Sequence, residues 1–343
     1  MNKVKKYVVF VVAIVAIALG VVFVIKHNAT KSSDKSNNAS SSNSNNTNSD
    51  TANDLEKFNY EFNPHVISKE YLQVYGADIE ETFYRFCDAV LNGENTFACA
   101  SQERLNAVLS IARYCLPVGS AYVDSDKCYV EGGIAYLTYT VSNEELLTKV
   151  EEFKAKVTEV ITAAVPYKED DLILAMELLT AVANKDDYDD EGIKLDNFMT
   201  CHPYKTIMQN IGICQEIAGE YIYYLLQVGI NATTCDGMDQ SQEYAHMWAI
   251  VEIDGEHFHV DPTFTIEHKD GLAFFCLDDE RRAEYGDFNI NDLNFSESDV
   301  VHYTIDSKKY KELWNAETYT IDHEKRIINY TVFYSGEKRE YKY

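Results

Sequence analysis

The chain has 343 residues, 46% of them hydrophobic, with 56 acidic and 30 basic side chains and a formal net charge of −26. So acidic a surface repels phosphates, which argues against nucleic acid as a partner and leaves a solvated acidic surface as the simplest interpretation. Its eight cysteines lack the dense, regular spacing of a disulfide scaffold. Bridges among Cys87, Cys99, Cys115 and Cys128 therefore compete with buried free thiols.

Residues 1–27 are typical of a signal anchor. Three lysines precede an uncharged apolar run from Tyr7 to Ile25, and a helix of that length spans roughly 28 Å, close to the hydrocarbon core of a bilayer. The lysines predict a cytoplasmic N-terminus and an extracytoplasmic globular part, so that the protein crosses the cell membrane once. A cleaved signal peptide with a site at Ala16–Ala18 is the alternative, but cleavage there would leave apolar residues on the mature end.

Composition divides the rest of the chain into four parts. Residues 28–54 form a Ser/Asn-rich tract with nothing to bury, which we expect to be a disordered linker. Residues 55–145 are expected to form an N-terminal α+β region of unknown role. Residues 146–299 are expected to form the domain that carries the chemical motifs, and residues 300–343 are expected to form β-hairpins that turn at 322–325 and 335–338.

Capping and periodicity predict the elements in chain order. One helix is expected over 68–93, capped by Ser68 and stopped by Gly93. The segment 119–142, rich in Tyr, Val and Thr, predicts strands with turns near 125–126 and 132–133. Further helices are expected over 101–117, 142–165 and 170–184, with caps at Ser101 and Ser142.

Cys214 lies where an amphipathic helix is expected to begin, in the segment "GICQEIAGEY". Apolar residues recur at spacings of three and four after it, and Gly229 closes the helix. Unpaired N–H groups at a helix start stabilise an anion, so this position favours a thiolate and can also hold the oxyanion of an acyl-transfer intermediate.

Two alternating runs around Asp254-Gly255 predict a hairpin with a two-residue turn. In that register Ile253 faces Glu256 and Trp248 faces Asp261, which makes Asp261 the diagonal neighbour of His246 on one face. The same face carries Ile250, Glu252, His257 and His259, and the opposite face carries Met247, Ala249, Val251, Ile253, Phe258 and Val260. A carboxylate and an imidazole can meet across this face, and His257 is expected to be a solvated surface residue.

These residues resemble the transglutaminase-like superfamily of papain-like thiol enzymes. The resemblance rests on "HPYKTIMQNIGICQ", "LLQVGI", "AHMW", "HVDPTF" and "FFCLDDERRAEYG", in order, over about 161–287. It implies an α+β core in which the helix bearing Cys packs on an antiparallel sheet bearing His and Asp. It also implies Cys214 as nucleophile, His246 as base and Asp261 as its orienting partner.

The sequence departs from the family pattern beside these motifs. Glu216 places a negative charge one turn from the thiol, which we expect to be solvent-exposed and to oppose the thiolate. Ala249 replaces a common Asn, and Phe264 replaces the final Trp. The triad itself is intact. Three further side chains are candidates for contacting the substrate or oxyanion: Tyr204, Gln215 and Trp248, with packing an equal alternative for Tyr204.

The favoured interpretation is an extracytoplasmic thiol enzyme that forms an acyl-enzyme on a peptide amide and passes the acyl group to water or an amine. Hydrolysis is favoured over cross-linking, the substrate is expected to be a peptide or protein outside the cell, such as a cell-wall peptide, and no cofactor is expected. The alternative is a catalytically degenerate surface binding module. A third interpretation is a metal site built from Cys201, His202, His257 and His259. It is the least favoured, because the spacings of these residues fit no compact ligand motif.

Overall fold

The structure, a computed structural model, describes residues 55–192, 201–238, 245–285, 292–296 and 299–343. The expected membrane anchor and Ser/Asn tract fall outside these residues. Among the helices of the described ranges, none has both the length and the apolar character to cross a bilayer. Residues 53–343 cluster as one unit, and the boundaries expected at 145/146 and 299/300 stay predictions.

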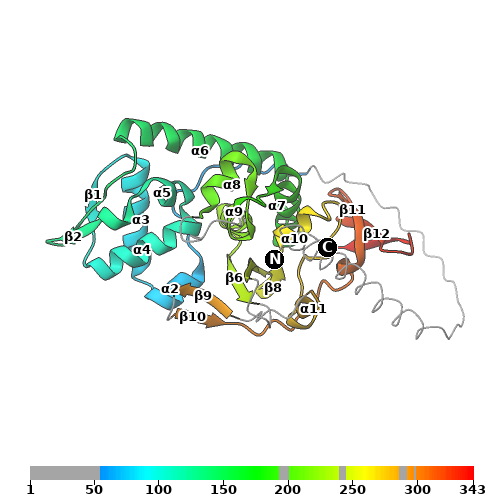
Figure 1. Cartoon of the computed structure of the whole chain (residues 1–343). Coiled ribbons are helices and arrows are strands. Elements are labelled where there is room, and N and C mark those ends of the chain that lie inside the picture. The colour runs from blue at the N-terminus through cyan, green and yellow to red at the C-terminus, as the bar shows by residue number, and fades with distance from the viewer. Residues whose placement is uncertain (1–54, 193–200, 239–244, 286–291, 297–298) are drawn as a thin grey trace, which may run out of the picture. The chain divides into compact units, whose positions relative to one another are not determined.

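The predicted hairpin supplies two strands of a three-stranded antiparallel sheet in the order β6-β7-β8, with its first strand, β7, at the centre (Figure 1). Its strands are β6 (Ala232–Met238), β7 (Ala245–Ile253) and β8 (Glu256–Val260). Asp254 and Gly255 both have positive φ, 52° and 77°, as a tight hairpin turn requires. Ile253 pairs with Glu256 and Ala249 with Val260, so the register read from the alternation is confirmed.

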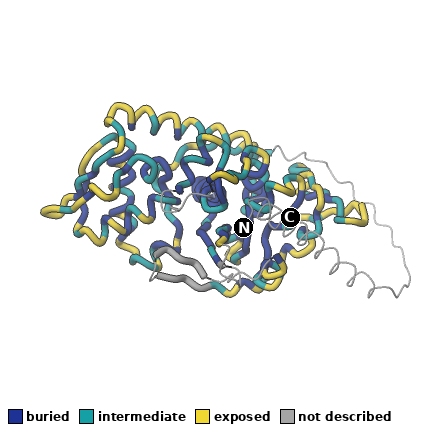
Figure 2. Tube along the Cα trace, viewed as in Figure 1, coloured by how far each residue is buried: buried dark blue, intermediate teal, exposed yellow. Residues whose placement is uncertain are grey.

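Helix α9 (Cys214–Gln227) packs on this sheet and is the most enclosed element near it (Figure 2). Every residue from Glu216 to Gln227 is buried. Gly219 allows the close packing, because a Cβ at that position would lie 2.4 Å from Cγ of Pro203 and 2.8 Å from the ring of Tyr114. The helix therefore fits between the sheet, α8 (Pro203–Gln209) and α4 (Gln102–Cys115).

The single helix expected over 68–93 is wrong. The chain forms α2 (Lys69–Tyr75) and α3 (Ile79–Leu91), which are separated at Gly76, where φ is +85°. A glycine adopts this conformation without strain, so it ends the first helix. Ser68 makes no cap hydrogen bond, because its hydroxyl donates to Glu70 instead.

The expectation of strands from 119 onward is wrong at its start and right further along. Pro117 opens α5 (Pro117–Tyr122), because proline fits the first position of a helix, where its missing N–H costs no hydrogen bond. After a 3-10 turn, η1 (Ser125–Lys127), come the strands β2 (Tyr129–Glu131) and β3 (Ile134–Tyr136), with the predicted turn at Gly132-Gly133 between them. They form a sheet with the earlier strand β1 (Thr96–Ala98), in the order β1-β3-β2.

The long helices begin where the sequence predicts, and the predicted cap at Ser142 is confirmed. Ser142 Oγ accepts from Glu145 N at 3.2 Å at the start of α6 (Asn143–Ala164), and Asp170 Oδ1 accepts from Ile173 N at 3.3 Å at the start of α7 (Asp171–Lys185). Helix α6 lies along the outside of the fold, with exposed residues on its outer face (Figures 1 and 2). Helix α7 lies between α6 and α9 and contacts both.

The C-terminal residues form the predicted hairpins. A sheet in the order β11-β12-β13 turns at 323–326 and 333–337. Its strands are β11 (Ala316–Asp322), β12 (Ile327–Val332) and β13 (Lys338–Lys342), after η4 (Leu313–Asn315). Two more strands, β9 (Asp292–Ser296) and β10 (Asp299–His302), pair antiparallel, and the short helices α10 (Pro262–Ile266) and α11 (Asp279–Ala283) follow β8.

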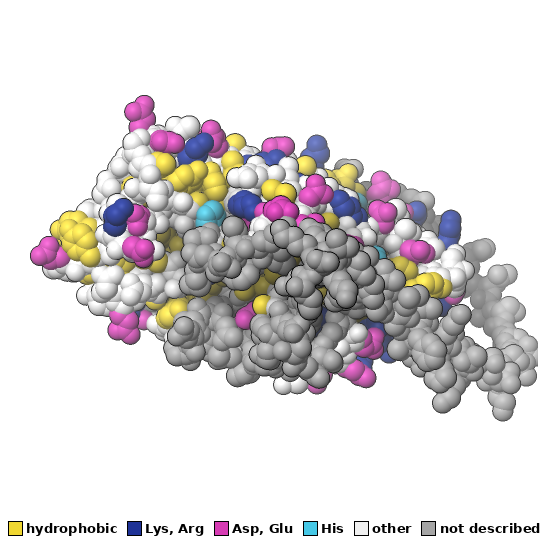
Figure 3. All heavy atoms as spheres, in the orientation of Figure 1, with side chains coloured by type: hydrophobic (Ala, Val, Ile, Leu, Met, Phe, Trp, Pro, Cys, Tyr) yellow, Lys and Arg dark blue, Asp and Glu magenta, His cyan; other side chains and the backbone are white. Residues whose placement is uncertain are grey.

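Both faces of the central sheet are covered. The face of Ala249 and Val251 belongs to the main core, and the face of Trp248 and Ile250 packs with Cys235 and Ile305. His257, expected to be solvated, is half-buried and stacks on Tyr303 with ring centroids 4.0 Å apart. The C-terminal chain crosses this face, which the local alternation could not indicate. On the displayed outer surface, acidic and basic side chains are interspersed (Figure 3).

Candidate active site

Cys214 is the first residue of α9, as the sequence predicts. The preceding Ile213 is extended, with φ −88° and ψ 171°, so the chain enters the helix from a strand-like segment. All eight cysteines are free, which rules out the bridges considered for Cys87, Cys99, Cys115 and Cys128. Seven of the thiols are buried and only Cys214 is partly exposed. It is therefore the cysteine that a substrate or reagent can reach.

His246 and Asp261 meet as the hairpin register predicts. Nε2 of His246 lies 2.7 Å from Oδ2 of Asp261, with the histidine 9% and the aspartate 1% exposed. Asp261 directly follows β8 and caps α10, where its Oδ1 accepts from Phe264 N at 3.1 Å. The cap fixes one carboxylate oxygen and leaves the other for the imidazole.

The imidazole is held in a charged form. Burial by itself lowers the pKa of His246, but the charge and hydrogen bond of Asp261, followed by those of Cys214, outweigh burial and raise it to about 9. Burial raises the pKa of Asp261, and His246 and then Arg282 more than offset this and lower it. Because Asp261 occupies Nε2, the thiol is left with Nδ1. The three side chains thus form one connected chain.

Two rings stack on the imidazole. Phe264 lies almost flat on His246, with centroids 4.6 Å apart and planes at 12°, and Trp248 lies at 5.8 Å and 25°. Phe264 is half-buried. Stacking restricts rotation of the ring, so its nitrogens stay directed at Asp261 and the thiol.

The expected opposition from Glu216 is corrected by the structure. Its side chain is buried rather than solvent-exposed, and Oε2 accepts from Ile213 N at 3.1 Å and lies 3.3 Å from Lys205 Nζ. The glutamate therefore satisfies a free N–H at the helix start, as a residue at its third position can. Because Lys205 neutralises much of its charge, Glu216 stabilises the helix instead of opposing a thiolate.

The three candidates for substrate contact lie in different settings. Trp248 is fully buried and its Nε1–H donates to Nδ1 of His259 at 2.9 Å, so its side chain is not accessible to a substrate. Tyr204 stacks on Phe153 and its hydroxyl lies 3.1 Å from that of Tyr122, which favours the packing alternative. Gln215 is half-buried beside Cys214, and its amide donates to Cys201 O at 3.5 Å.

Tyr188 is a neighbour of the thiol that sequence reasoning missed. It lies on β4 (Asp187–Tyr188), which pairs in parallel with β5 (Ile211–Gly212) just before Cys214. Burial and then the charge of Cys214 raise the pKa of Tyr188, and a hydrogen bond with the Cys214 backbone opposes them. A hydrogen bond that lowers a phenol pKa is one that the oxygen accepts, so the donor is the Cys214 N–H. No local pattern marks a two-residue strand.

Arg282 is the second residue that was missed. It is fully buried, and its Nη2 lies 3.5 Å from Asp261 Oδ2. Its segment, "DDERRAEYG", is so rich in charge that the sequence favours a solvated helix face. Only the packing of α11 against the sheet shows otherwise.

The side chains of the metal alternative do not gather. Across the described ranges, no group of three or more His, Cys, Asp or Glu residues is arranged to hold a metal ion. Both ring nitrogens of His259 are already used, because Nδ1 accepts from Trp248 and Nε2 lies 2.9 Å from Asp279 Oδ1.

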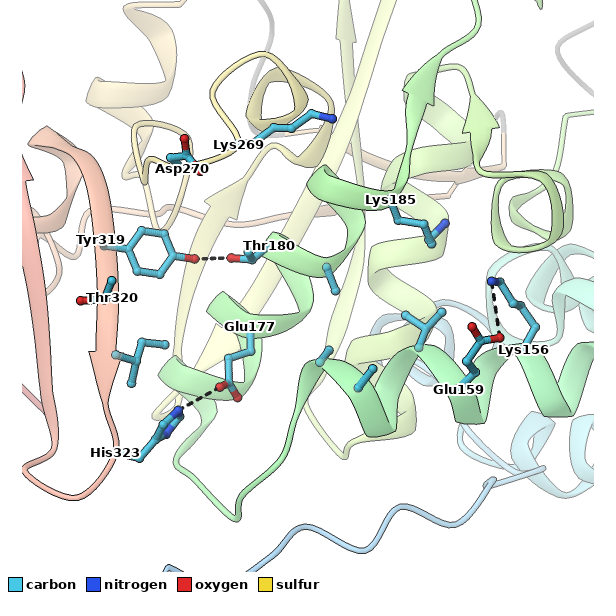
Figure 4. Close-up of a pocket in the computed structure, with 15 residues that line it drawn as sticks. Lys156, Glu159, Glu177, Thr180, Lys185, Lys269, Asp270, Tyr319, Thr320 and His323 are labelled. Atoms are coloured by element: carbon cyan, nitrogen blue, oxygen red, sulfur yellow. Dashed lines mark hydrogen bonds and ion pairs between the residues drawn. The ribbon is translucent and has the colours of Figure 1, made fainter.

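A cavity of about 670 Å³ lies elsewhere, between α6, α7, β11 and the loop after α10 (Figure 4). Glu177, His323, Thr180 and Tyr319 interact in pairs along its wall. Burial and then Glu169 raise the pKa of Glu177 to about 8. The triad residues are not among the described residues that line it, so this cavity is separate from the thiol.

Comparison with known proteins gives partial likenesses. No family model and no curated protein match the chain. Among solved structures, a candidate cysteine protease from Cytophaga hutchinsonii is 15% identical with a TM-score of 0.26, and the match covers 34% of this chain and 37% of the protease chain. The structure of a transglutaminase is 12% identical with a TM-score of 0.29, and the match covers 43% of this chain and 46% of the transglutaminase chain. The chain thus spans less than half of either structure.

The fold itself follows from the geometry. A helix that begins at a partly exposed cysteine packs on an antiparallel sheet, and this sheet presents a histidine to an aspartate at the end of the next strand. The sheet is flanked by an N-terminal group of helices and by a second, C-terminal sheet. This arrangement is the α+β core expected from the resemblance to transglutaminase-like and papain-like enzymes.

Proposed function

We propose that the protein is a thiol enzyme of the transglutaminase-like class that cleaves peptide amide bonds through Cys214, His246 and Asp261. The observation that carries the proposal is the 2.7 Å contact of His246 with Asp261, on a sheet that packs against the helix begun by Cys214. Among the eight cysteines this thiol alone is both partly exposed and linked to an imidazole.

The chemistry follows from the charges of the site. The Cys214 thiolate attacks the amide carbon, and the oxyanion that forms is stabilised by the positive end of the α9 dipole. The His246 imidazolium then gives its proton to the leaving amine as the C–N bond breaks, which leaves an acyl thioester and a neutral imidazole. Water attacks the thioester, and His246 takes one of its two protons. The carboxylic acid is released, and the Cys214 thiolate and the His246 imidazolium are restored.

We favour water over an amine as the acceptor, and a peptide or protein outside the cell, such as a cell-wall peptide, as the substrate. The apolar run from Tyr7 to Ile25 supports a membrane anchor with the catalytic part outside. We expect the protein in the membrane fraction, with release by a protease that cuts within residues 28–54. A mature N-terminus near Leu19 would show a cleaved signal peptide instead.

Alkylation of Cys214 by iodoacetamide tests the thiol. The wild-type protein should react near pH 6 far faster than a free cysteine, because an ordinary thiol is almost fully protonated there. Cys214→Ala should abolish the fast labelling and leave the fold intact, and Cys276→Ala, at a buried thiol, serves as the matched control. Slow, ordinary labelling that is indifferent to His246→Ala would favour the alternative, a surface binding module with a degenerate triad.

A further inference from the structure

Arg282 is a fully buried arginine in a short helix. The helix is fixed from both sides: Asp278 Oδ1 accepts from Arg281 N at 2.7 Å, and Asp279 accepts from His259 and from Ile305 N. Arg282 N donates to Asp278 O at 2.8 Å, and the side chain is fully buried. A buried guanidinium is costly unless an anion and other favourable contacts compensate for its lost hydration.

Its contacts converge on the triad. Nη2 of Arg282 lies 3.5 Å from Asp261 Oδ2, the same oxygen that lies 2.7 Å from His246 Nε2. The guanidinium carbon lies 4.2 Å from the ring centre of Trp248 and 5.6 Å from that of Phe264. Both rings also stack on the imidazole. One cation thus touches the orienting acid and approaches both rings that hold the base.

The charges of the site balance only when Arg282 is included. With the thiolate and the imidazolium formed, Cys214 and Asp261 carry two negative charges and His246 and Arg282 two positive charges. After the imidazolium gives up its proton, Asp261 would be a buried anion without compensation if Arg282 were absent. The guanidinium also repels the imidazolium, which makes His246 the stronger acid toward a leaving amine.

We infer that Arg282 is a positioning residue of the thiol site, which keeps Asp261 ionised and oriented and promotes proton release from His246. The inference rests on the proposed function. Arg282 acts through Asp261 and makes no contact with the reacting atoms in this assignment.

Other ionisable groups near Arg282 and His246 come from several elements. The pair His259 and Asp279 lies on the same side of the sheet. The other groups are Cys235 on β6, Cys214 on α9, Tyr188 on β4, and Asp278 and Tyr285, which flank α11. None of them is changed by a substitution at Arg282, so a shift in titration reports the guanidinium.

The pH dependence of Cys214 alkylation in the full chain tests the inference. The alkaline step, at which His246 loses its proton, should move up by roughly one pH unit in Arg282→Met, because a cation that opposed the imidazolium is gone. Arg282→Lys, which keeps the charge, should leave the step near its wild-type position. Arg281→Met is the matched control, since Arg281, the neighbour of Arg282 in the chain, pairs with Glu284 and stacks on Tyr285 instead.

Each result decides the question. A folded Arg282→Met protein with an unshifted alkaline step overturns the inference, since a purely structural role would change only stability. If that variant does not fold, the double change Asp261→Asn/Arg282→Met should restore folding by removing both buried charges, and failure to restore it also overturns the inference. A wild-type Cys214 that labels as an ordinary thiol overturns the proposed function itself, which is a separate and distinguishable failure.

Discussion

Two histidine–aspartate pairs lie on neighbouring strands of the same sheet and differ in charge. His246 contacts Asp261 at 2.7 Å and His259 contacts Asp279 at 2.9 Å. Asp261 and Cys214 overcome the effect of burial and raise the pKa of His246 to about 9. Burial lowers the pKa of His259, and its aspartate fails to offset that effect.

The second ring nitrogen explains the difference. Nδ1 of His259 accepts a hydrogen bond from Trp248 Nε1–H, which requires that nitrogen to carry no proton. In His246 the second nitrogen meets a thiol, which can become an anion and favour the charged ring. Asp279 is also more exposed than Asp261, at 23% against 1% of the side chain. A histidine–aspartate contact alone therefore does not make a catalytic base.

Replacing each histidine in turn should distinguish the two histidine–aspartate pairs by the largest difference in turnover. We expect His246→Ala to reduce turnover on the order of 10⁴-fold, because the thiolate and the proton donor are lost together. His259→Ala should reduce turnover only a few-fold, through packing. Steady-state rates on a peptide amide, with circular dichroism to verify folding, measure both. Equal losses in the two variants would contradict the assignment of His246 as the base.

Replacing each aspartate should separate the pairs by a smaller factor. Asp261→Asn should lower turnover by about 10² to 10⁴-fold through loss of imidazole orientation and charge stabilisation, with less effect on alkylation of Cys214. Asp279→Asn is the matched change and should leave both rates within a few-fold. A variant Asp261→Asn with wild-type turnover would exclude it from the triad.

Stability should depend on pH through His246 with a definite sign. Because its folded pKa is raised, its contribution is fully present below the unfolded value of ~6.5 and is lost as pH rises through about 9. Urea unfolding of wild type and His246→Gln should therefore differ by a few kcal/mol more at pH 6 than at pH 10. The difference should be measured in the Cys214→Ala background as well, where it should shrink. The opposite pH trend would contradict the charged imidazole.

Trp248→Phe should have the smallest effect of these substitutions and should test why the two histidines differ in pKa. It removes the donor to His259 Nδ1 and keeps an aromatic ring beneath Arg282, so the pKa of His259 should rise. We expect a loss of about 1 kcal/mol in unfolding free energy, the typical value of one hydrogen bond. Histidine proton resonances followed against pH would measure the shift, and an unchanged His259 titration would show that the tryptophan does not set its charge.

Local patterns predicted much of the site. The caps at Ser101 and Ser142, the turn at Asp254-Gly255 and the helix start at Cys214 each depend on a few adjacent residues, and the structure has all of them. Strand alternation also fixed which side chains share a face, because a one-residue shift would move every one of them. The contact of His246 with Asp261 follows from that register.

The predictions from sequence fail where segments far apart in the chain determine the local structure or burial. The break at Gly76 depends on how α2 and α3 pack, and a lone glycine inside a helical pattern does not require it. Glu216 was expected to be exposed, but Lys205 on the preceding helix and the N–H of Ile213 give it buried partners. His257 is covered by Tyr303, which lies 46 residues further along the chain.

The sequence alone determined the position of Cys214 at a helix start, the shared face of His246 and Asp261, and the α+β class, because these depend on periods of two and 3.6 residues and on capping. The tertiary structure decided the environment of those groups. It buried Arg282 against Asp261, stacked Phe264 on His246 and brought Tyr188 to the backbone of Cys214. Charge and burial at a site come from chain segments far apart in sequence, and no local periodicity encodes which of them meet.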